Sequence, residues 1–145
     1  MKQYQLSGKE VKKLAEQYGF IGRKSRIEVQ EADNEKLYFV DKKLVLIEKQ
    51  DIMVPSLKTE SGLPLVTVDM GAVKFVAKGA DVMRPGITKI DEFEKGALVV
   101  VVDEKNHKPL AICQALFSSG EMKQMTQGKV LRNLHYVGDD YWKQE

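Results

Sequence analysis

The stretch VDMGAVKFVAKGADVMRPGITK, residues 68–89, holds the strongest structural signals in the chain. Asp69 is a good N-cap, and the residues after it predict a helix that runs to about Lys78. At about 100° per residue, Lys74, Lys78 and Gly71 fall on one narrow face of that helix. The broad remaining arc, which we expect to be buried, holds Ala72, Val73, Phe75, Val76 and Ala77.

The second half of this stretch is rich in turn signals. Gly79 suits the left-handed position that follows a helix, and residues 80–83 read as a short extended segment in which Val82 and Met83 serve core or strand packing. The sequence Arg84-Pro85-Gly86-Ile87 predicts a type II turn, which would leave Arg84 free to reach outward. Lysines in a last helical turn and a glycine after it are ordinary features of helix ends. The spacing alone therefore favours ordinary helix-end and turn roles for these residues over a ligand-binding role.

Composition limits the classes of protein that this chain can be. Its 145 residues suit one domain or two very small ones, and 43% hydrophobic residues suffice for a packed core. The formal net charge is only +2, so a nucleic-acid interface has to come from local clusters of cations. Cys113 is the single cysteine, and no apolar run approaches the length of a membrane span. We therefore expect a cytoplasmic protein with no disulfide and no membrane partner.

The first half of the chain opens with a well-marked helix. Ser7 and Glu10 match the capping-box pattern, and Leu6 and Val11 are spaced to form a hydrophobic staple. Gly19 is a natural stop for this helix. Alternating segments follow, which predicts a small antiparallel meander. Its expected strands are 25–31, 37–40 and 44–49, joined by turns at Asp33-Asn34 and Asp41-Lys42.

Residues 53–64 hold two prolines, two serines and a glycine without periodicity, so we interpret them as a linker. This interpretation divides the chain into domains 1–62 and 63–145. The continuous apolar run 97–102 predicts a strand that is buried on both faces. The other expected elements of the second domain are strands at 65–68, 110–117 and 130–136 and a helix that begins at a second capping box, Ser118 with Glu121, and ends near Gly128.

The order of these features resembles the PUA domain, an RNA-binding β-barrel named after pseudouridine synthases and archaeosine transglycosylases. The resemblance covers about residues 65–143 and rests on the 68–89 stretch, the strand pair after it, and VLRNLHYVGDDYW at 130–142. It is closer to the translation-machinery-associated proteins, which include the malignant T-cell-amplified protein, ligatin and archaeal relatives. The resemblance implies an α+β chain. A small domain of one helix and an antiparallel sheet precedes a mostly antiparallel PUA barrel with short helices.

The same resemblance implies what the protein does. We expect it to bind structured RNA, either tRNA or ribosomal RNA, and to act without catalysis in translation initiation or recycling. The small ribosomal subunit or a translation factor is the expected partner. A glycine in the loop lets a phosphate or ribose approach the backbone, while cations supply charge. Carried over by position, the RNA-contacting residues are Lys74, Lys78, Gly79, Ala80, Arg84, Pro85 and Gly86.

Two other functions stay open at this point. The chain could be an accessory RNA-docking subunit of an RNA-modification enzyme, such as tRNA-guanine transglycosylase or a pseudouridine synthase. It could also be a protein-interaction adaptor whose N-terminal half binds a partner. Arg23, Lys24 and Arg26 form the densest basic cluster and are either a solvated loop or a second RNA contact.

Catalytic and metal-binding constellations are poorly supported. Cys113 lies in the apolar segment LAICQAL, where cysteine behaves as a small hydrophobe, and no glycine elbow accompanies it. His107 and His135 are too few, and wrongly spaced, to form a zinc site with it. Asp139-Asp140 would point to opposite faces of a strand. We expect no catalytic residue, no metal and no cofactor, and a buried role for Trp142 at the end of the barrel.

Overall fold

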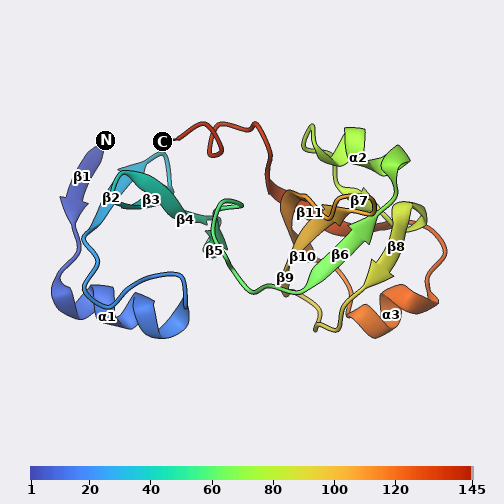
Figure 1. Ribbon diagram of the computed structural model, residues 1–145, viewed down its shortest axis with the longest axis horizontal. Coiled ribbons are helices and arrows are strands. Elements are labelled where there is room, and N and C mark those ends of the chain that lie inside the picture. Colours follow the sequence, from blue (N-terminus) through green and yellow to red (C-terminus); the bar gives the residue numbers. More distant parts are fainter. Residues whose placement is uncertain (145) are drawn as a thin grey trace. The chain divides into compact units, whose positions relative to one another are not determined.

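The computed structural model describes residues 1–144 (Figure 1). Contacts divide them into two compact units, Met1–Ser61 and Gly62–Lys143, with Gln144 grouped with the first. Each unit has its own sheet. The α+β class is confirmed, and the two units are described separately below.

The first unit is one helix on a five-stranded antiparallel meander. The sheet order follows the chain, β1-β2-β3-β4-β5. The elements are β1 (Lys2–Gln5), α1 (Gly8–Gln17), β2 (Ile27–Ala32), β3 (Glu35–Val40), β4 (Lys43–Lys49) and β5 (Ile52–Pro55). The predicted helix and meander are therefore correct. Strands β1 and β5 were not predicted, and β5 occupies residues that we interpreted as linker.

Both unpredicted strands lie at the edges of the sheet, where the sequence signal is weak. All four residues of β1 are exposed, so the strand has no apolar alternation, and its pairing of Tyr4 with Val29 on β2 comes from tertiary structure. Strand β5 ends at Pro55, opposite Leu46. Proline is tolerated on an edge strand because its missing N–H is not needed there. The same residue made the segment look like a linker.

The capping box and the turns predicted in this unit are confirmed. The capping box of α1 is complete: Glu10 N–H donates to Ser7 Oγ at 3.2 Å, and Ser7 N–H donates to Glu10 Oε1 at 3.1 Å. Val11 then packs into the core with Ile27 and Val29. The three hairpins turn through residue pairs 33–34, 41–42 and 50–51, all with positive φ. Two-residue turns of this kind match the twist of the flanking strands.

The second unit is a curled six-stranded sheet with short helices. Its order is β7-β11-β10-β9-β6-β8, antiparallel except for the parallel pair β6–β9. The elements are β6 (Leu65–Val68), α2 (Met70–Val76), β7 (Val82–Met83), the 3₁₀ turn η1 (Arg84–Gly86), β8 (Ile87–Ile90), β9 (Leu98–Asp103), β10 (Pro109–Ala115), α3 (Ser119–Gln124) and β11 (Lys129–Tyr136). Strands β7 and β8 form opposite edges of the sheet, yet only η1 separates them in the chain. The sheet must therefore curl into a barrel.

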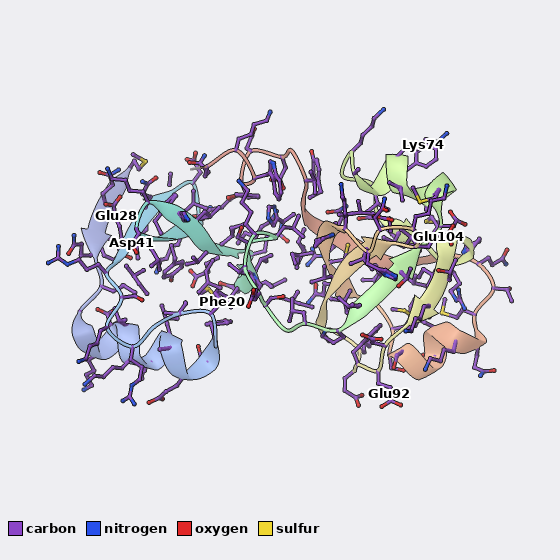
Figure 2. All side chains as sticks on the ribbon, viewed as in Figure 1. Phe20, Glu28, Asp41, Lys74, Glu92 and Glu104 are labelled. Atoms are coloured by element: carbon purple, nitrogen blue, oxygen red, sulfur yellow. The ribbon has the colours of Figure 1, made fainter. Side chains whose placement is uncertain are left out.

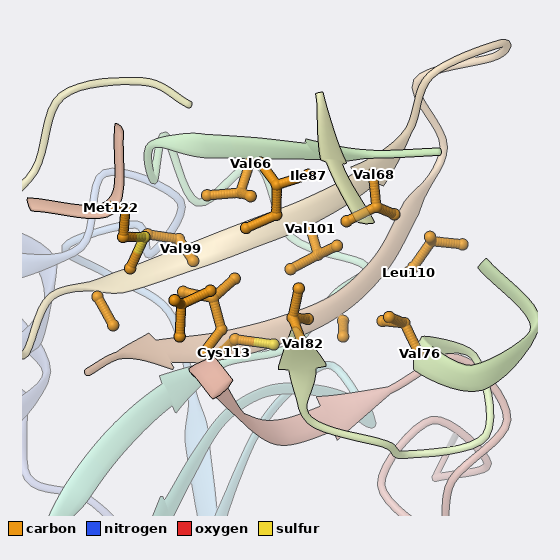
Figure 3. Close-up of a cluster of buried hydrophobic side chains, with 14 residues drawn as sticks. Val66, Val68, Val76, Val82, Ile87, Val99, Val101, Leu110, Cys113 and Met122 are labelled. Carbon is orange, nitrogen blue, oxygen red and sulfur yellow. The ribbon is translucent and has the colours of Figure 1, made fainter. Parts of the chain in front are cut away.

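Valine side chains dominate the core of this barrel (Figure 3). Val99 and Val101 point into it from β9, while Val100 and Val102 are buried on the opposite face. This confirms the prediction that the 97–102 run is a strand buried on both sides. Cys113 on β10 and Met122 on α3 complete the packing.

Helix α3 is shorter than predicted. Glu121 N–H donates to Ser118 Oγ at 3.2 Å, so Ser118 is the N-cap. The Glu121 carboxylate contacts the Ser118 hydroxyl at 3.4 Å, and only half of the predicted capping box forms. The helix ends at Gln124, because β11 begins at Lys129 and the chain must first reverse. Within residues 1–144, no helix has the length and apolar character needed to span a bilayer.

Candidate nucleic-acid interface

Helix α2 is held at both ends by local hydrogen bonds. Ala72 N–H donates to the N-cap carboxylate of Asp69 at 2.9 Å. At the other end, Gly79 N–H donates to Val76 O at 3.0 Å and Ala80 N–H to Phe75 O at 3.1 Å. This pair is a Schellman motif with Gly79 at φ +97°. The predicted helix stop is confirmed, although the helical segment itself ends at Val76, two residues before Lys78.

The turn after β7 differs from the prediction. Arg84–Gly86 forms the 3₁₀ turn η1, and Gly86 does not adopt the positive φ of a type II turn. Glycine is needed for a different reason: a Cβ on Gly86 would lie 2.9 Å from Cβ of Ala72 on α2. Gly86 O also accepts a hydrogen bond from Asp69 N–H at 2.8 Å. Packing against the helix, rather than turn geometry, therefore selects this glycine.

Arg84 does not reach outward as predicted. Its side chain is half-buried, Nε donates to Met122 O at 2.6 Å, and Nη1 donates to Ile87 O at 3.3 Å. The guanidinium thus ties η1 to α3. Because a bond between a charged donor and a carbonyl is strong, the principal role of Arg84 in this structure is to hold the barrel together.

Lys74 and Lys78 are both exposed in this region. Lys74 extends from α2 away from the barrel (Figure 2), with Nζ 5.4 Å from the centroid of the neighbouring Phe75 ring. Lys78 follows it in the turn after the helix. A third lysine, Lys129, pairs with Asp81 at 3.3 Å. The structure therefore keeps both predicted lysines available to an anionic partner.

An open groove of about 710 Å³ lies between α2 and the segment from β7 to η1. Phe75 and Met83 line it, although their side chains are 59% and 51% exposed. The prediction that Phe75 is buried is wrong, because α2 packs on the core through Ala72, Val73 and Val76 and leaves Phe75 on its outer side. Met83 lies in strand β7, where only its neighbour Val82 is buried. Helical periodicity cannot reveal which side of a helix the rest of the fold leaves exposed.

We call the surface formed by these elements the α2 face. It comprises Lys74, Phe75, Lys78, Gly79, Ala80, Met83, Pro85 and Gly86.

The remaining sequence candidates lie elsewhere. Arg23, Lys24 and Arg26 are located in the segment between α1 and β2 of the first unit, and all three are exposed. Cys113 is fully buried, and burial raises the pKa of its thiol, so it has the character of a core residue. His107 is exposed in the β9–β10 loop. Among residues 1–144, no group of three histidine, cysteine or acidic side chains is placed to hold a metal ion.

Asp139 organises the segment after β11, which the sequence did not predict. The strand ends at Tyr136, so Asp139 and Asp140 are in a turn rather than on a strand. Asp139 Oδ2 lies 2.9 Å from Nδ1 of the buried His135. The carboxylate also accepts the N–H groups of Tyr136 at 2.8 Å and of Trp142, which is half-buried, at 2.7 Å. Burial works to raise the pKa of Asp139, but these three hydrogen bonds outweigh it and hold the pKa below its ordinary value.

The chain matches two families of domains. Residues 64–137 match the PUA domain, and residues 2–59 match a domain of unknown function, DUF1947. An uncharacterised protein of Methanocaldococcus jannaschii is 40% identical, over 97% of this chain and 95% of its own length. Translation machinery-associated protein 20 of Saccharomyces cerevisiae is 34% identical, over 84% of this chain and 74% of its own length.

Solved structures share the fold. A conserved PUA domain protein from Thermoplasma acidophilum has a TM-score of 0.81 and 28% identity, over 96% of both chains. A chain of an H/ACA ribonucleoprotein bound to a substrate RNA has a TM-score of 0.53 and 29% identity. That similarity covers 63% of this chain and 29% of the other.

Proposed function

The chain belongs to the PUA-domain family and is related to translation machinery-associated protein 20, and we propose that it binds structured RNA through the α2 face. It acts in the cytoplasm on tRNA or ribosomal RNA during translation initiation or recycling. It contributes docking rather than bond chemistry. The small ribosomal subunit or a translation factor is its partner.

The observation that carries this proposal is the pairing of exposed cations with an exposed aromatic ring. Lys74 and Lys78 can neutralise phosphates, and phosphate neutralisation supplies most of the sequence-independent affinity for nucleic acid. Phe75, beside Lys74, offers a ring face on which an unpaired base can stack. Gly79 and Gly86 fix the backbone beside these side chains, because each packs closely against a neighbour, Gly79 on Tyr136 and Gly86 on Ala72. Arg84, Pro85 and Gly86 belong to the interface chiefly by shaping its edge, because Arg84 is held inside the barrel.

One further observation supports the proposal. A chain that shares the fold over 63% of this one, with 29% identity, belongs to a ribonucleoprotein bound to RNA. The nearly neutral net charge of +2 means that affinity must come from local cations. Arg23, Lys24 and Arg26 would supply a second, weaker contact from the first unit.

The test compares two charge-matched double variants. The Lys74→Ala/Lys78→Ala variant removes two cations from the α2 face, and Lys12→Ala/Lys13→Ala removes two exposed cations from α1. Affinity for tRNA and for ribosomal RNA is measured by fluorescence anisotropy over a range of salt concentrations. The first variant should bind more weakly and lower the slope of log affinity against log salt by about 0.7–0.9 for each phosphate that is no longer neutralised. Equal behaviour of the two variants would show that the α2 face is not the RNA site.

Co-sedimentation in sucrose gradients tests the cellular role. The protein should travel with small ribosomal subunits, and the lysine variant should disappear from that fraction. If it travels instead with an RNA-modification enzyme, the accessory-subunit function replaces the one proposed.

A further inference from the structure

The loop that follows α2, residues 77–81, is held by hydrogen bonds from a side chain of β11. Asn133 Nδ2 donates to Val76 O at 3.2 Å and to Ala80 O at 3.0 Å. These carbonyls lie 57 and 53 residues away in sequence, and they stand on either side of Gly79. One amide group therefore bridges the end of α2 and the residue at which the chain leaves it.

The main chain of Asn133 makes a second connection to the same loop. Its N–H donates to Asp81 Oδ1 at 2.8 Å, and Asp81 Oδ2 pairs with Lys129 Nζ at 3.3 Å. Tyr136, three residues further along β11, packs its ring against Gly79. The conformation of residues 79–81 is thus set by β11 rather than by α2 alone.

Asn133 makes these bonds at a cost. Among residues 1–144, Asn133 Oδ1 is the one buried side-chain nitrogen or oxygen atom without a hydrogen-bond partner. The amide cannot be reversed, because Oδ1 would then face the carbonyl oxygens of Val76 and Ala80. Buried polar atoms without partners are uncommon in folded proteins, so the two bonds that Nδ2 makes determine how this amide is oriented.

We infer that Asn133 is a positioning residue for RNA binding, a role that rests on the proposed function of the α2 face. By fixing the two carbonyls around Gly79, it keeps the Gly79–Ala80 backbone open to a ribose or phosphate. It also holds that backbone at a set distance from Lys74 and Lys78. Asn133 is neutral and only half-exposed, so its contribution is geometric. Contacts of a functional loop are effective only when supporting residues fix them in place.

This role predicts a signature that differs from that of the lysines. Removing the amide should weaken RNA binding without changing its salt dependence, because no cation is deleted. It should also loosen residues 77–81 locally. Gln114 offers a matched control, since its half-exposed amide on β10 accepts a bond from Arg132 Nη2 at 2.8 Å and donates to Gly96 O at 3.3 Å, outside the loop.

The experiment uses Asn133→Ala, Asn133→Asp and Gln114→Ala in the full chain. RNA affinity, its salt slope and amide hydrogen exchange are measured at a temperature at which every variant is folded. Asn133→Ala should lose about tenfold in affinity at an unchanged slope, as expected for two neutral hydrogen bonds. Asn133→Asp should also bind more weakly, but its added negative charge changes the salt slope, so only Asn133→Ala tests the slope. Exchange should accelerate at residues 77–81 in these variants only. Asn133→Asp keeps the shape but turns a carboxylate toward two carbonyl oxygens, so it should not rescue binding.

Three outcomes would overturn the inference, and they can be told apart. If the lysine variant binds RNA weakly while both Asn133 variants bind like the unaltered protein, the α2 face stands and the positioning role fails. If Gln114→Ala loses as much affinity as Asn133→Ala, the effect is general destabilisation and the positioning role fails as well. If the lysine variant binds normally, the proposed RNA site is wrong and the role of Asn133 in RNA binding falls with it.

Discussion

Gly79 and Tyr136 are in direct contact, and the tyrosine ring occupies the space that a side chain on residue 79 would need. A Cβ added to Gly79 would lie 2.7 Å from Cε1 and 3.0 Å from Cζ of that ring. Gly79 also has φ +97°, which disfavours any residue with a Cβ. The helix stop that the sequence predicts is therefore also the point at which α2 is docked on β11.

Gly79→Ala should destabilise the barrel more than an alanine at a glycine that has only a backbone requirement. Gly96 is the control, since its φ is +89° and no atom lies within 4 Å of its Cβ position. Backbone strain alone should cost about 1–2 kcal/mol at either site. Gly79→Ala should cost clearly more, because the Tyr136 ring must also move. Urea unfolding measures both values, and equal losses would show that the ring shifts freely.

Arg84→Lys should destabilise the protein nearly as much as Arg84→Ala. Lysine retains the charge but cannot reproduce the two directed bonds of the guanidinium to Met122 O and Ile87 O. We expect each variant to lose about 1.5–3 kcal/mol, measured by chemical denaturation.

The same pair of variants tests whether Arg84 contacts RNA. If Arg84 acts only inside the barrel, folded Arg84→Lys and Arg84→Ala should bind RNA with the same salt slope as the unaltered protein. A smaller slope in Arg84→Ala alone would mean that the guanidinium also neutralises a phosphate.

Phe75→Ala should weaken RNA binding with little effect on stability. The ring is 59% exposed, so its removal leaves no cavity, whereas loss of a stacked base costs about 1–3 kcal/mol of binding free energy. Phe75→Tyr, which keeps a ring face, should bind normally. Anisotropy with single-stranded and duplex RNA provides the measurement. A loss confined to duplex RNA would contradict a stacking role.

Asp139 should make the free energy of unfolding fall at acidic pH. Because its pKa in the folded protein is lowered, the carboxylate stabilises the fold above its ordinary pKa of about 4, and this contribution is lost as the pH falls through the lower folded value. Asp139→Asn should reduce stability by about 1–3 kcal/mol at neutral pH, since one amide oxygen cannot replace the carboxylate at His135, Tyr136 and Trp142.

The exposed neighbour Asp140 provides the control for this prediction. The free energy of unfolding, measured from pH 7 down to about pH 3, should fall less with acid for Asp139→Asn than for Asp140→Asn. Parallel curves would show that Asp139 does not contribute to the acid sensitivity of the fold.

The features predicted correctly from the sequence are those whose interactions span a few residues. The capping box of Ser7 and Glu10 and the Asp69 N-cap each join residues three apart, and the Gly79 stop is closed by a bond over five. The residue types alone establish such contacts, because the chain has few other ways to satisfy the same backbone groups. The order of these elements carried the resemblance to the PUA domain, and that resemblance pointed to Lys74 on α2 and Lys78 in the turn after it.

Long-range packing accounts for the rest of the candidate site. Arg84 turns inward to Met122, 38 residues away, and Asn133 reaches 57 residues back to Val76. Gly86 is required by a residue on α2, and Phe75 on that helix is exposed because the helix packs on the core through Ala72, Val73 and Val76. No local pattern encodes these relationships, since they depend on which strands become neighbours in the barrel. Local sequence therefore specifies the helix, its stop and its cations, whereas packing across the sheet specifies how they are held and which of them face solvent.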